Sequence, residues 1–154
     1  MVKYFERLSV NSAETKHLGE FLARKIAGKK RQKALIFCLK GDLGGGKTTF
    51  LQGFAKGLGI KQKILSPTFL IMKRFELKNS RIKQFSNFYN FDCYRIIKSK
   101  EILSLGFKTI ISDPKNIIAI EWADRIKKIL PKNTIWINFE FVDKKKRKIR
   151  ISKF

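Results

Sequence analysis

The sequence predicts an α/β fold in which a mixed β-sheet is flanked by helices. Residues 34–39 form a short apolar run with the length and residue types of a buried strand. A glycine-rich loop follows, and residues 48–58 then repeat apolar side chains at helical spacing before Gly59. A second apolar run, residues 117–120, ends in Glu121. Such an order indicates an open sheet with a ligand site at the carboxyl ends of its strands.

The loop at residues 41–48 matches the phosphate-binding pattern G-x-x-x-x-G-K-[ST] at every fixed position. Its successive glycines let consecutive backbone N–H groups face one anion, and the helix N-terminus adds unpaired N–H groups. Lys47 supplies a charge for the β- and γ-phosphates, and the Thr48 hydroxyl can ligate Mg²⁺. The alternative is a glycine-rich turn without a ligand, but the flanking strand and helix favour a single P-loop NTPase domain spanning residues 1–154.

The composition indicates a folded domain with an unusual charge. Of the 154 residues, 44% are hydrophobic, which excludes a disordered chain, and the net charge is +23. This charge indicates either a surface that contacts RNA or another polyanion, or a codon bias that enriches lysine throughout the chain. No apolar run is long enough to span a membrane, and residues 1–7 do not lead into a signal peptide. Cys38 and Cys93 lie in apolar runs, so we expect reduced core cysteines in a cytosolic protein.

The first two expected elements are a strand at residues 4–10 and a helix at residues 13–27. Asn11 or Ser12 is a suitable N-cap for this helix. Its apolar positions recur at helical spacing, and they are Leu18, Phe21, Leu22 and Ile26. His17 has no potential metal-ligating neighbour in the sequence and is expected on the helix surface.

Two candidate site residues lie on the extended segments that follow. A turn and a strand are expected at residues 64–72, where the Thr68 hydroxyl either contacts a γ-phosphate or its metal or simply opens the strand. A polar hairpin connection at residues 76–81 leads to an aromatic-rich extended stretch at residues 85–96. Asp92 in this stretch serves a metal or water, or forms a structural ion pair with Arg95, and the sequence alone favours neither.

The acid-ended strand is the second part of the predicted site. A short helix capped by Ser99 is expected to end at Gly106, and a turn at residues 112–114 precedes the strand. A buried parallel strand carries its last residue to the carboxyl edge, so Glu121 is expected to act on Mg²⁺ or on the attacking water. The alternative is an ordinary surface glutamate at a strand end. If Glu121 has the first role, Trp122 lies close to the nucleotide.

The C-terminal part is expected to hold a helix at residues 123–130 and strands at residues 134–142 and 149–151. Five basic residues at 144–148 separate the two strands. At a hairpin tip this run would be solvated, and a contact with a phosphate backbone is the alternative.

With these segments in order, the chain resembles the TsaE (YjeE) family, small bacterial P-loop ATPases needed for threonylcarbamoyladenosine modification of tRNA. The resemblance covers nearly the whole chain, and its motifs are the loop at 41–50, Ser-Pro-Thr-Phe at 66–69, Phe-Asp-Cys-Tyr-Arg at 91–95 and Ile-Glu-Trp at 120–122. The departures are mild: Gly45 stands where alanine is usual, Asn90 where histidine is usual, and Ala123 where proline is common. Asparagine cannot transfer a proton as histidine does, but it can still donate a hydrogen bond.

The resemblance implies roles for individual residues. It assigns catalysis to Lys47, Thr68, Asp92 and Glu121, and Mg²⁺ binding to Thr48 and Glu121. The implied nucleotide-contacting residues lie on the first helix and on the loop, and they are Ser12, Thr15, Asp42, Leu43, Gly44, Gly45, Gly46, Lys47, Thr48 and Thr49.

The resemblance also implies ATP and Mg²⁺ as cofactors and weak ATPase activity in the isolated protein. The implied partner is the TsaB–TsaD complex in the cytoplasm, away from any membrane, with tRNA in the assembled complex and direct tRNA contact left open. Two other classes stay open. One is a P-loop small-molecule kinase, although no arginine-rich lid is evident between residues 79 and 106. The other is an RNA-binding module that uses ATP only structurally.

Overall fold

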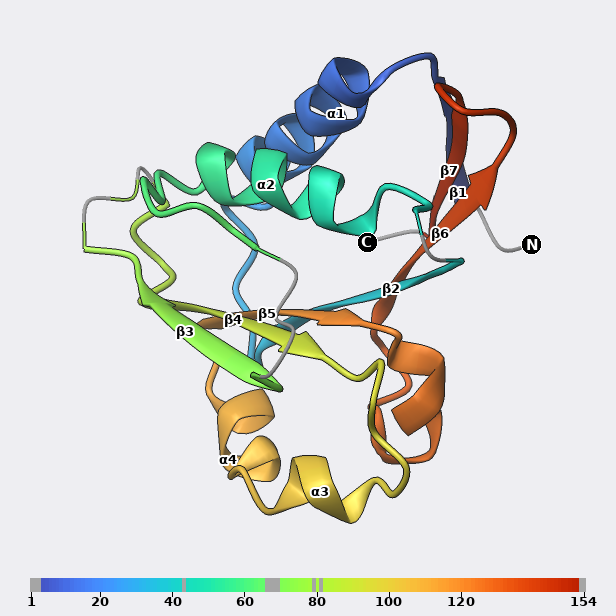
Figure 1. The fold of residues 1–154 in the computed structure, drawn as a ribbon. Coiled ribbons are helices and arrows are strands. Elements are labelled where there is room, and N and C mark those ends of the chain that lie inside the picture. Colours follow the sequence, from blue (N-terminus) through green and yellow to red (C-terminus); the bar gives the residue numbers. More distant parts are fainter. Residues whose placement is uncertain (1–3, 43, 66–69, 79, 81, 153–154) are drawn as a thin grey trace.

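Strands from both halves of the chain form one mixed sheet with helices on each face (Figure 1). The computed structural model describes residues 4–42, 44–65, 70–78, 80 and 82–152. Within these residues the sheet has seven strands in the order β1-β7-β6-β2-β5-β4-β3. Their bounds are Tyr4–Ser9 (β1), Leu35–Gly41 (β2), Met72–Glu76 (β3), Asn87–Asp92 (β4), Asn116–Glu121 (β5), Ile135–Phe141 (β6) and Arg147–Ser152 (β7).

The centre of the sheet is parallel and its margins are antiparallel. Strand β2 pairs in parallel with β5 and β6, and β5 pairs in parallel with β4. The β1–β7, β6–β7 and β3–β4 pairs are antiparallel. The carboxyl ends of β2, β4 and β5 therefore meet at one edge, where open α/β sheets bind their ligands. This arrangement confirms the predicted mixed α/β fold.

The helices are divided between the two faces of the sheet (Figure 1). Helices α1 (Ser12–Lys25) and α2 (Lys47–Gly57) cover one face. The short helices α3 (Lys100–Leu103) and α4 (Phe107–Ser112) lie on the other face, as does the 3-10 helix η1 (Ala123–Ile129). In the described part of the chain, none of these helices has the length and apolar character needed to cross a membrane.

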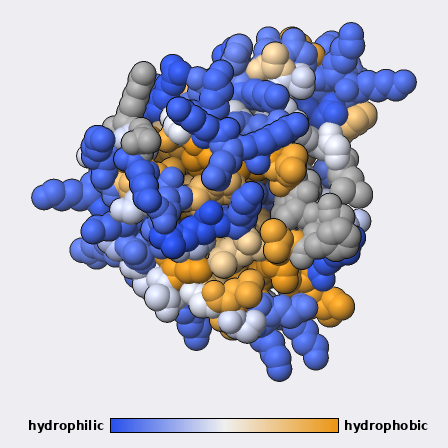
Figure 2. All heavy atoms as spheres, turned by 60° about the vertical axis from the view of Figure 1, so that its left-hand side comes forward, coloured by the Kyte–Doolittle hydropathy of each residue, from blue (hydrophilic) through white to orange (hydrophobic). Residues whose placement is uncertain are grey.

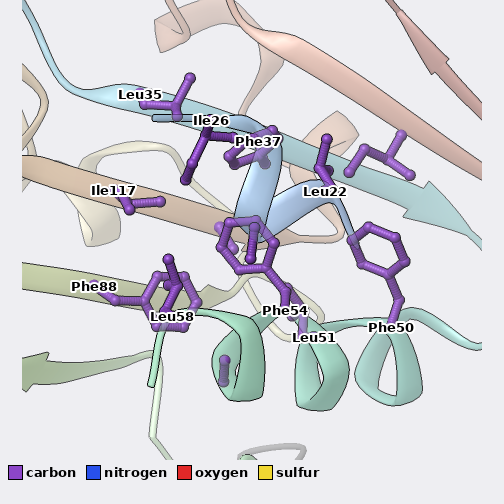
Figure 3. Close-up of a cluster of buried hydrophobic side chains, with 14 of the residues drawn as sticks. Leu22, Ile26, Leu35, Phe37, Phe50, Leu51, Phe54, Leu58, Phe88 and Ile117 are labelled. Atoms are coloured by element: carbon purple, nitrogen blue, oxygen red, sulfur yellow. The ribbon is translucent and has the colours of Figure 1, made fainter. Parts of the chain in front are cut away.

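Helix α2 is held by an aromatic core between itself, α1 and the sheet (Figure 3). The Phe54 ring meets Phe37 of β2 edge-on, with ring centroids 5.2 Å apart. Burial of each such side chain contributes about 1.5–3 kcal/mol. At Gly53 the backbones of α1 and α2 touch, because a Cβ there would lie 1.8 Å from the Lys16 carbonyl oxygen. This packing fixes the start of α2 against the sheet edge.

Helix α1 begins with a reciprocal cap. The Asn11 side chain accepts a hydrogen bond from the Glu14 backbone N–H (2.9 Å), and the Glu14 carboxylate accepts one from Val10 N–H (2.9 Å). The first bond satisfies an N–H of the first helical turn that has no partner within the helix, and the second holds the residue that precedes the cap. Of the two predicted caps, the structure therefore selects Asn11 and leaves the Ser12 side chain for other contacts.

The second core, on the α3 and α4 face, contains both cysteines. Cys38 and Cys93 are free and buried, as predicted, and burial raises the pKa of each thiol to about 12. On this face the structure differs from the sequence-based prediction in the cap of α3 and in the presence of α4. The Glu101 carboxylate, rather than the Ser99 side chain, accepts the N–H groups before α3. Helix α4 was not predicted, and it forms because Phe107 is completely buried against this core.

Candidate functional site: a P-loop cavity at the carboxyl edge

The glycine loop leaves β2 and enters α2 through left-handed backbone conformations. Gly44 has φ +72° and Gly46, the N-cap of α2, has φ +94°. Side chains other than glycine rarely adopt such angles, so the loop can curl only with glycine here. No side chain caps the first turn of α2, and its N–H groups remain available for an anion. The backbone thus provides the phosphate cradle that the motif predicts.

Lys47 lies inside this loop, with only 6% of its surface exposed. Its Nζ donates to the carbonyl oxygens of Gly41 (2.5 Å) and Asp42 (2.9 Å), and it lies 4.2 Å from the centroid of the Trp122 ring. Burial lowers the pKa of Lys47, and the negative charge of Glu121 opposes that shift. The ammonium group is therefore held at the loop by two carbonyls and an aromatic face.

Thr48 and Glu121 meet although they are 73 residues apart. The Thr48 hydroxyl donates to Glu121 Oε1 (3.0 Å), and Glu121 is 2% exposed. Its second oxygen, Oε2, is buried and has no hydrogen-bond partner among the described residues. A hydroxyl beside a carboxylate with an unpartnered oxygen is a donor set that suits Mg²⁺. These residues fit the metal that the sequence predicts for them.

Glu121 has a strongly perturbed acidity. Burial is the main cause that raises its pKa to about 7, and the nearby Asp92 carboxylate raises it further. The Thr48 hydrogen bond, the Lys47 charge and the Asn90 side chain act in the opposite direction and lower this pKa. A carboxyl group that titrates near neutral pH can exchange a proton with water during a reaction.

Asp92 ends β4 directly beside Glu121, its register partner at the end of β5. Its carboxylate accepts a hydrogen bond from Tyr94 N–H (2.9 Å). Burial raises the pKa of Asp92, whereas that hydrogen bond and the Lys47 charge lower it. Asn90 lies two residues earlier on the same face of β4 and is 3% exposed, and its Oδ1 has no partner among the described residues. Asp92 thus lies beside Glu121 at the sheet edge, and its negative charge affects the pKa of both Glu121 and Lys47.

Trp122 carries a strained backbone at the mouth of the site. Its φ is +56°, and no other non-glycine residue in the described ranges has a positive φ. Such a conformation costs about 1–3 kcal/mol and commonly occurs at functional sites. The indole ring covers the Lys47 ammonium on one side and meets the Tyr94 ring with centroids 5.1 Å apart. Trp122 therefore lies against the phosphate loop, where the sequence predicted it.

These groups line a cavity of about 640 Å³. Most predicted site residues share it: Ser12, Thr15, Gly44, Gly45, Gly46, Lys47, Thr48, Thr49 and Glu121. Asp42 is not among the lining residues, and its carbonyl oxygen accepts from Gly45 N–H and from Lys47 instead. Asp92 also lies outside the lining. Leu43 and Thr68 fall outside the described residues.

The cavity has lining residues that the sequence did not assign to the nucleotide. Asn11 contributes from the start of α1, and Lys144, Lys145 and Arg147 contribute from the β6–β7 hairpin. Arg147 Nε donates to the Gly44 carbonyl oxygen (3.0 Å). The basic run was visible in the sequence, but nothing in its spacing connects it to a loop 103 residues earlier. That link comes from the pairing of Gly41 with Phe139 in the sheet.

A glycine loop that opens α2, a buried lysine within it and an acid at the end of the neighbouring parallel strand define a P-loop nucleotide-binding protein. The family model described as "Threonylcarbamoyl adenosine biosynthesis protein TsaE" matches residues 9–149. The chain belongs to the TsaE family, whose role is in the biosynthesis of threonylcarbamoyladenosine in tRNA.

Individual relatives agree with this assignment. The tRNA threonylcarbamoyladenosine biosynthesis protein TsaE of Rickettsia felis is 36% identical over 138 residues, which is 89% of this chain and 73% of the relative. The protein of the same name from Borreliella burgdorferi is 38% identical over 70% of this chain and 74% of its own length. The crystal structure of YdiB from Bacillus subtilis matches with a TM-score of 0.72 and 29% identity, covering 99% of this chain and 86% of YdiB.

Proposed function

We propose that this chain binds ATP with Mg²⁺ and hydrolyses it in support of threonylcarbamoyladenosine formation on tRNA. The observation that carries the proposal is the Thr48–Glu121 hydrogen bond, which joins the phosphate loop to a buried acid with an unpartnered oxygen. An acid beside the Ser or Thr of the phosphate loop is the arrangement that holds Mg²⁺ in P-loop NTPases, and Glu121 occupies that position.

Each group has a role in this proposal. The N–H groups of residues 44–46 and the Lys47 ammonium would hold the phosphates, and Thr48 and Glu121 would hold Mg²⁺. When bound, the metal supplies positive charge that stabilises the charge developing on the phosphate oxygens. Glu121 would orient the attacking water and accept its proton, and the negative charge of the nearby Asp92 favours that proton transfer.

The proposed partner is the TsaB–TsaD complex in the cytoplasm, with tRNA present in the assembled complex. Lys47 is held by the loop carbonyls and Trp122, and Arg147 is bound to the loop from the hairpin. Such contacts must rearrange when phosphates compete for both cations. A partner that favours the rearranged state raises turnover, which supports weak activity in the isolated protein.

Glu121→Gln and Asp92→Asn test the proposal, since each keeps the side-chain shape and removes a negative charge. ATP binding should survive or tighten, and TsaB–TsaD-stimulated phosphate release should fall at least about tenfold. Glu76→Gln, an exposed carboxylate at the opposite edge of the sheet, is the matched control and should keep full activity.

Two results contradict parts of the proposal. Full phosphate release in either variant removes that residue from the catalytic set. Transfer of the phosphoryl group to a small molecule, in place of phosphate release, assigns the site to a kinase instead.

A further inference from the structure

A second, differently built hollow lies at the C-terminal end of α2, far along the helix from the phosphate loop. It has a volume of about 560 Å³. Its polar lining consists of Lys16, Lys56, Lys61 and Lys63 with Gln52 and Gln62, and none of the described residues that line it is a carboxylate. Figure 2 brings this end of α2 toward the viewer and shows many hydrophilic side chains around a smaller hydrophobic area.

The loop that carries two of these lysines is fixed in place. Leu58 and Ile64 anchor its ends, since at most 2% of the surface of each residue is exposed. Ile60 N–H donates to the Ala55 carbonyl (3.0 Å), and Gln52 Nε2 donates to the Ile64 carbonyl (3.0 Å). Lys61 and Lys63 thus lie on a backbone held against α2, and they line the hollow together with Lys16 of α1.

Most of this charge is uncompensated. Lys56 lies 3.6 Å from Glu20, and its position near the helix C-terminus also stabilises it. Lys16, Lys61 and Lys63 have no acidic partner among the described residues. Three exposed like charges around one hollow repel one another, and a bound anion removes that repulsion.

We propose that this hollow binds the phosphate backbone of RNA. Protein interfaces place apolar and aromatic residues at their centre and are depleted in lysine, whereas nucleic-acid interfaces are polar and strongly basic. The sequence pI of about 10.3 agrees with a polyanionic partner. Unlike the phosphate loop, the hollow lies at a helix C-terminus, so it suits backbone phosphates contacted by lysine side chains rather than a nucleotide seated on N–H groups.

The test compares two triple variants of the full chain with the same net charge. Lys16→Gln, Lys61→Gln and Lys63→Gln together remove the hollow's free charges. Lys108→Gln, Lys115→Gln and Lys128→Gln remove three exposed charges elsewhere, with Lys108 on the helix α4 that covers the other face. Binding of a fluorescent tRNA transcript is measured by anisotropy between about 50 and 200 mM salt.

Each lysine that contacts a phosphate contributes about 0.7–0.9 to the slope of log affinity against log salt. In the triple variant of Lys16, Lys61 and Lys63 the magnitude of this slope should therefore fall by about two to three. In the triple variant of Lys108, Lys115 and Lys128 the slope should stay unchanged. The single change Lys63→Gln should lose about 0.8.

Three results overturn the proposal: no tRNA binding by the unmodified chain, equal losses in both triple variants, or displacement of tRNA by polyglutamate as readily as by RNA. ATP binding by calorimetry is measured in parallel and should be unchanged in both variants. Failure of ATP binding in the unmodified chain contradicts the proposed ATPase alone, so the two proposals fail separately.

Discussion

Both ends of helix α2 lie beside basic side chains, and the two ends are built differently. At the N-terminal end the groups are buried: Lys47 is 6% exposed, Glu121 is 2% exposed, and each has a hydrogen bond that fixes it. At the C-terminal end Lys16, Lys61 and Lys63 are exposed side chains on anchored backbone. The N-terminal end thus holds its charged groups in one fixed arrangement, while the charged groups at the C-terminal end remain solvated.

This difference suits the buried end to a chemical reaction and the exposed end to the binding of a polyanion. Burial makes each charge expensive, so a buried group stays only where partners hold it, and its pKa shifts accordingly. Glu121 shows both effects. Solvated lysines interact through a screened field that attracts a polyanion without orienting a reaction. The four predictions below test this contrast, from the largest expected effect to the smallest.

Equivalent truncations at the two ends should have very different effects on ATP binding. Lys47→Ala removes a buried, hydrogen-bonded charge, and such losses cost about 2–5 kcal/mol, or at least about 30-fold in affinity. Lys56→Ala removes an exposed charge at the other end and should stay within about twofold. Isothermal calorimetry with both variants measures this, and comparable losses would show that burial does not set the difference.

Glu121 should make stability depend on pH. Its pKa is raised from 4.5 to about 7 in the folded chain, so the folded state binds more protons than the unfolded state between these values. Stability therefore falls as pH rises from about 4.5 to 7, by about 3 kcal/mol at the full extent of the shift. Glu121→Gln removes the free-energy cost of ionising this buried carboxyl group. Urea unfolding at pH 8 should show the variant to be more stable, with a gap that narrows at pH 5; a constant gap contradicts the raised pKa.

Arg147 is an intermediate case, because it lies at the buried end but is only half-buried. Its bond to the Gly44 carbonyl and its position over the Phe141 ring hold it at the cavity rim. Arg147→Ala should weaken ATP binding by about 1 kcal/mol, or about fivefold, on the scale of partly exposed charge contacts. Arg150→Ala, three residues along β7 and paired with Glu6, is the control and should have no effect on binding.

The smallest expected effect is a change in tryptophan fluorescence on nucleotide binding. Phosphates that draw Lys47 away from the Trp122 ring should change Trp122 emission, while Trp136, on strand β6, should respond less. The measurement is a fluorescence titration with ATP and Mg²⁺ of the unmodified chain and of Trp122→Phe. A nucleotide-dependent signal that survives in Trp122→Phe would place the responding ring elsewhere.

Much of the fold was predictable because its signals are local. The glycine loop, the Asn11 cap and the apolar run before Glu121 depend on residues a few positions apart, whose backbone preferences and hydrogen bonds follow from neighbours. Helix α4 was missed because it is six residues long and forms where Phe107 packs, not where its own residues favour a helix.

The sequence by itself determined the chemistry of the loop: Gly46 permits the left-handed turn into α2, and Lys47 and Thr48 follow it at fixed offsets. Only the tertiary structure decided which distant groups meet that loop. The pairing of β2 with β5 and β6 brings Glu121 to Thr48 and Arg147 to Gly44. The packing of α1 on α2 brings Lys16 to the hollow that Lys61 also lines. Local offsets are fixed by covalent geometry, whereas contacts across many residues depend on strand pairing and core packing, which no single stretch of sequence contains.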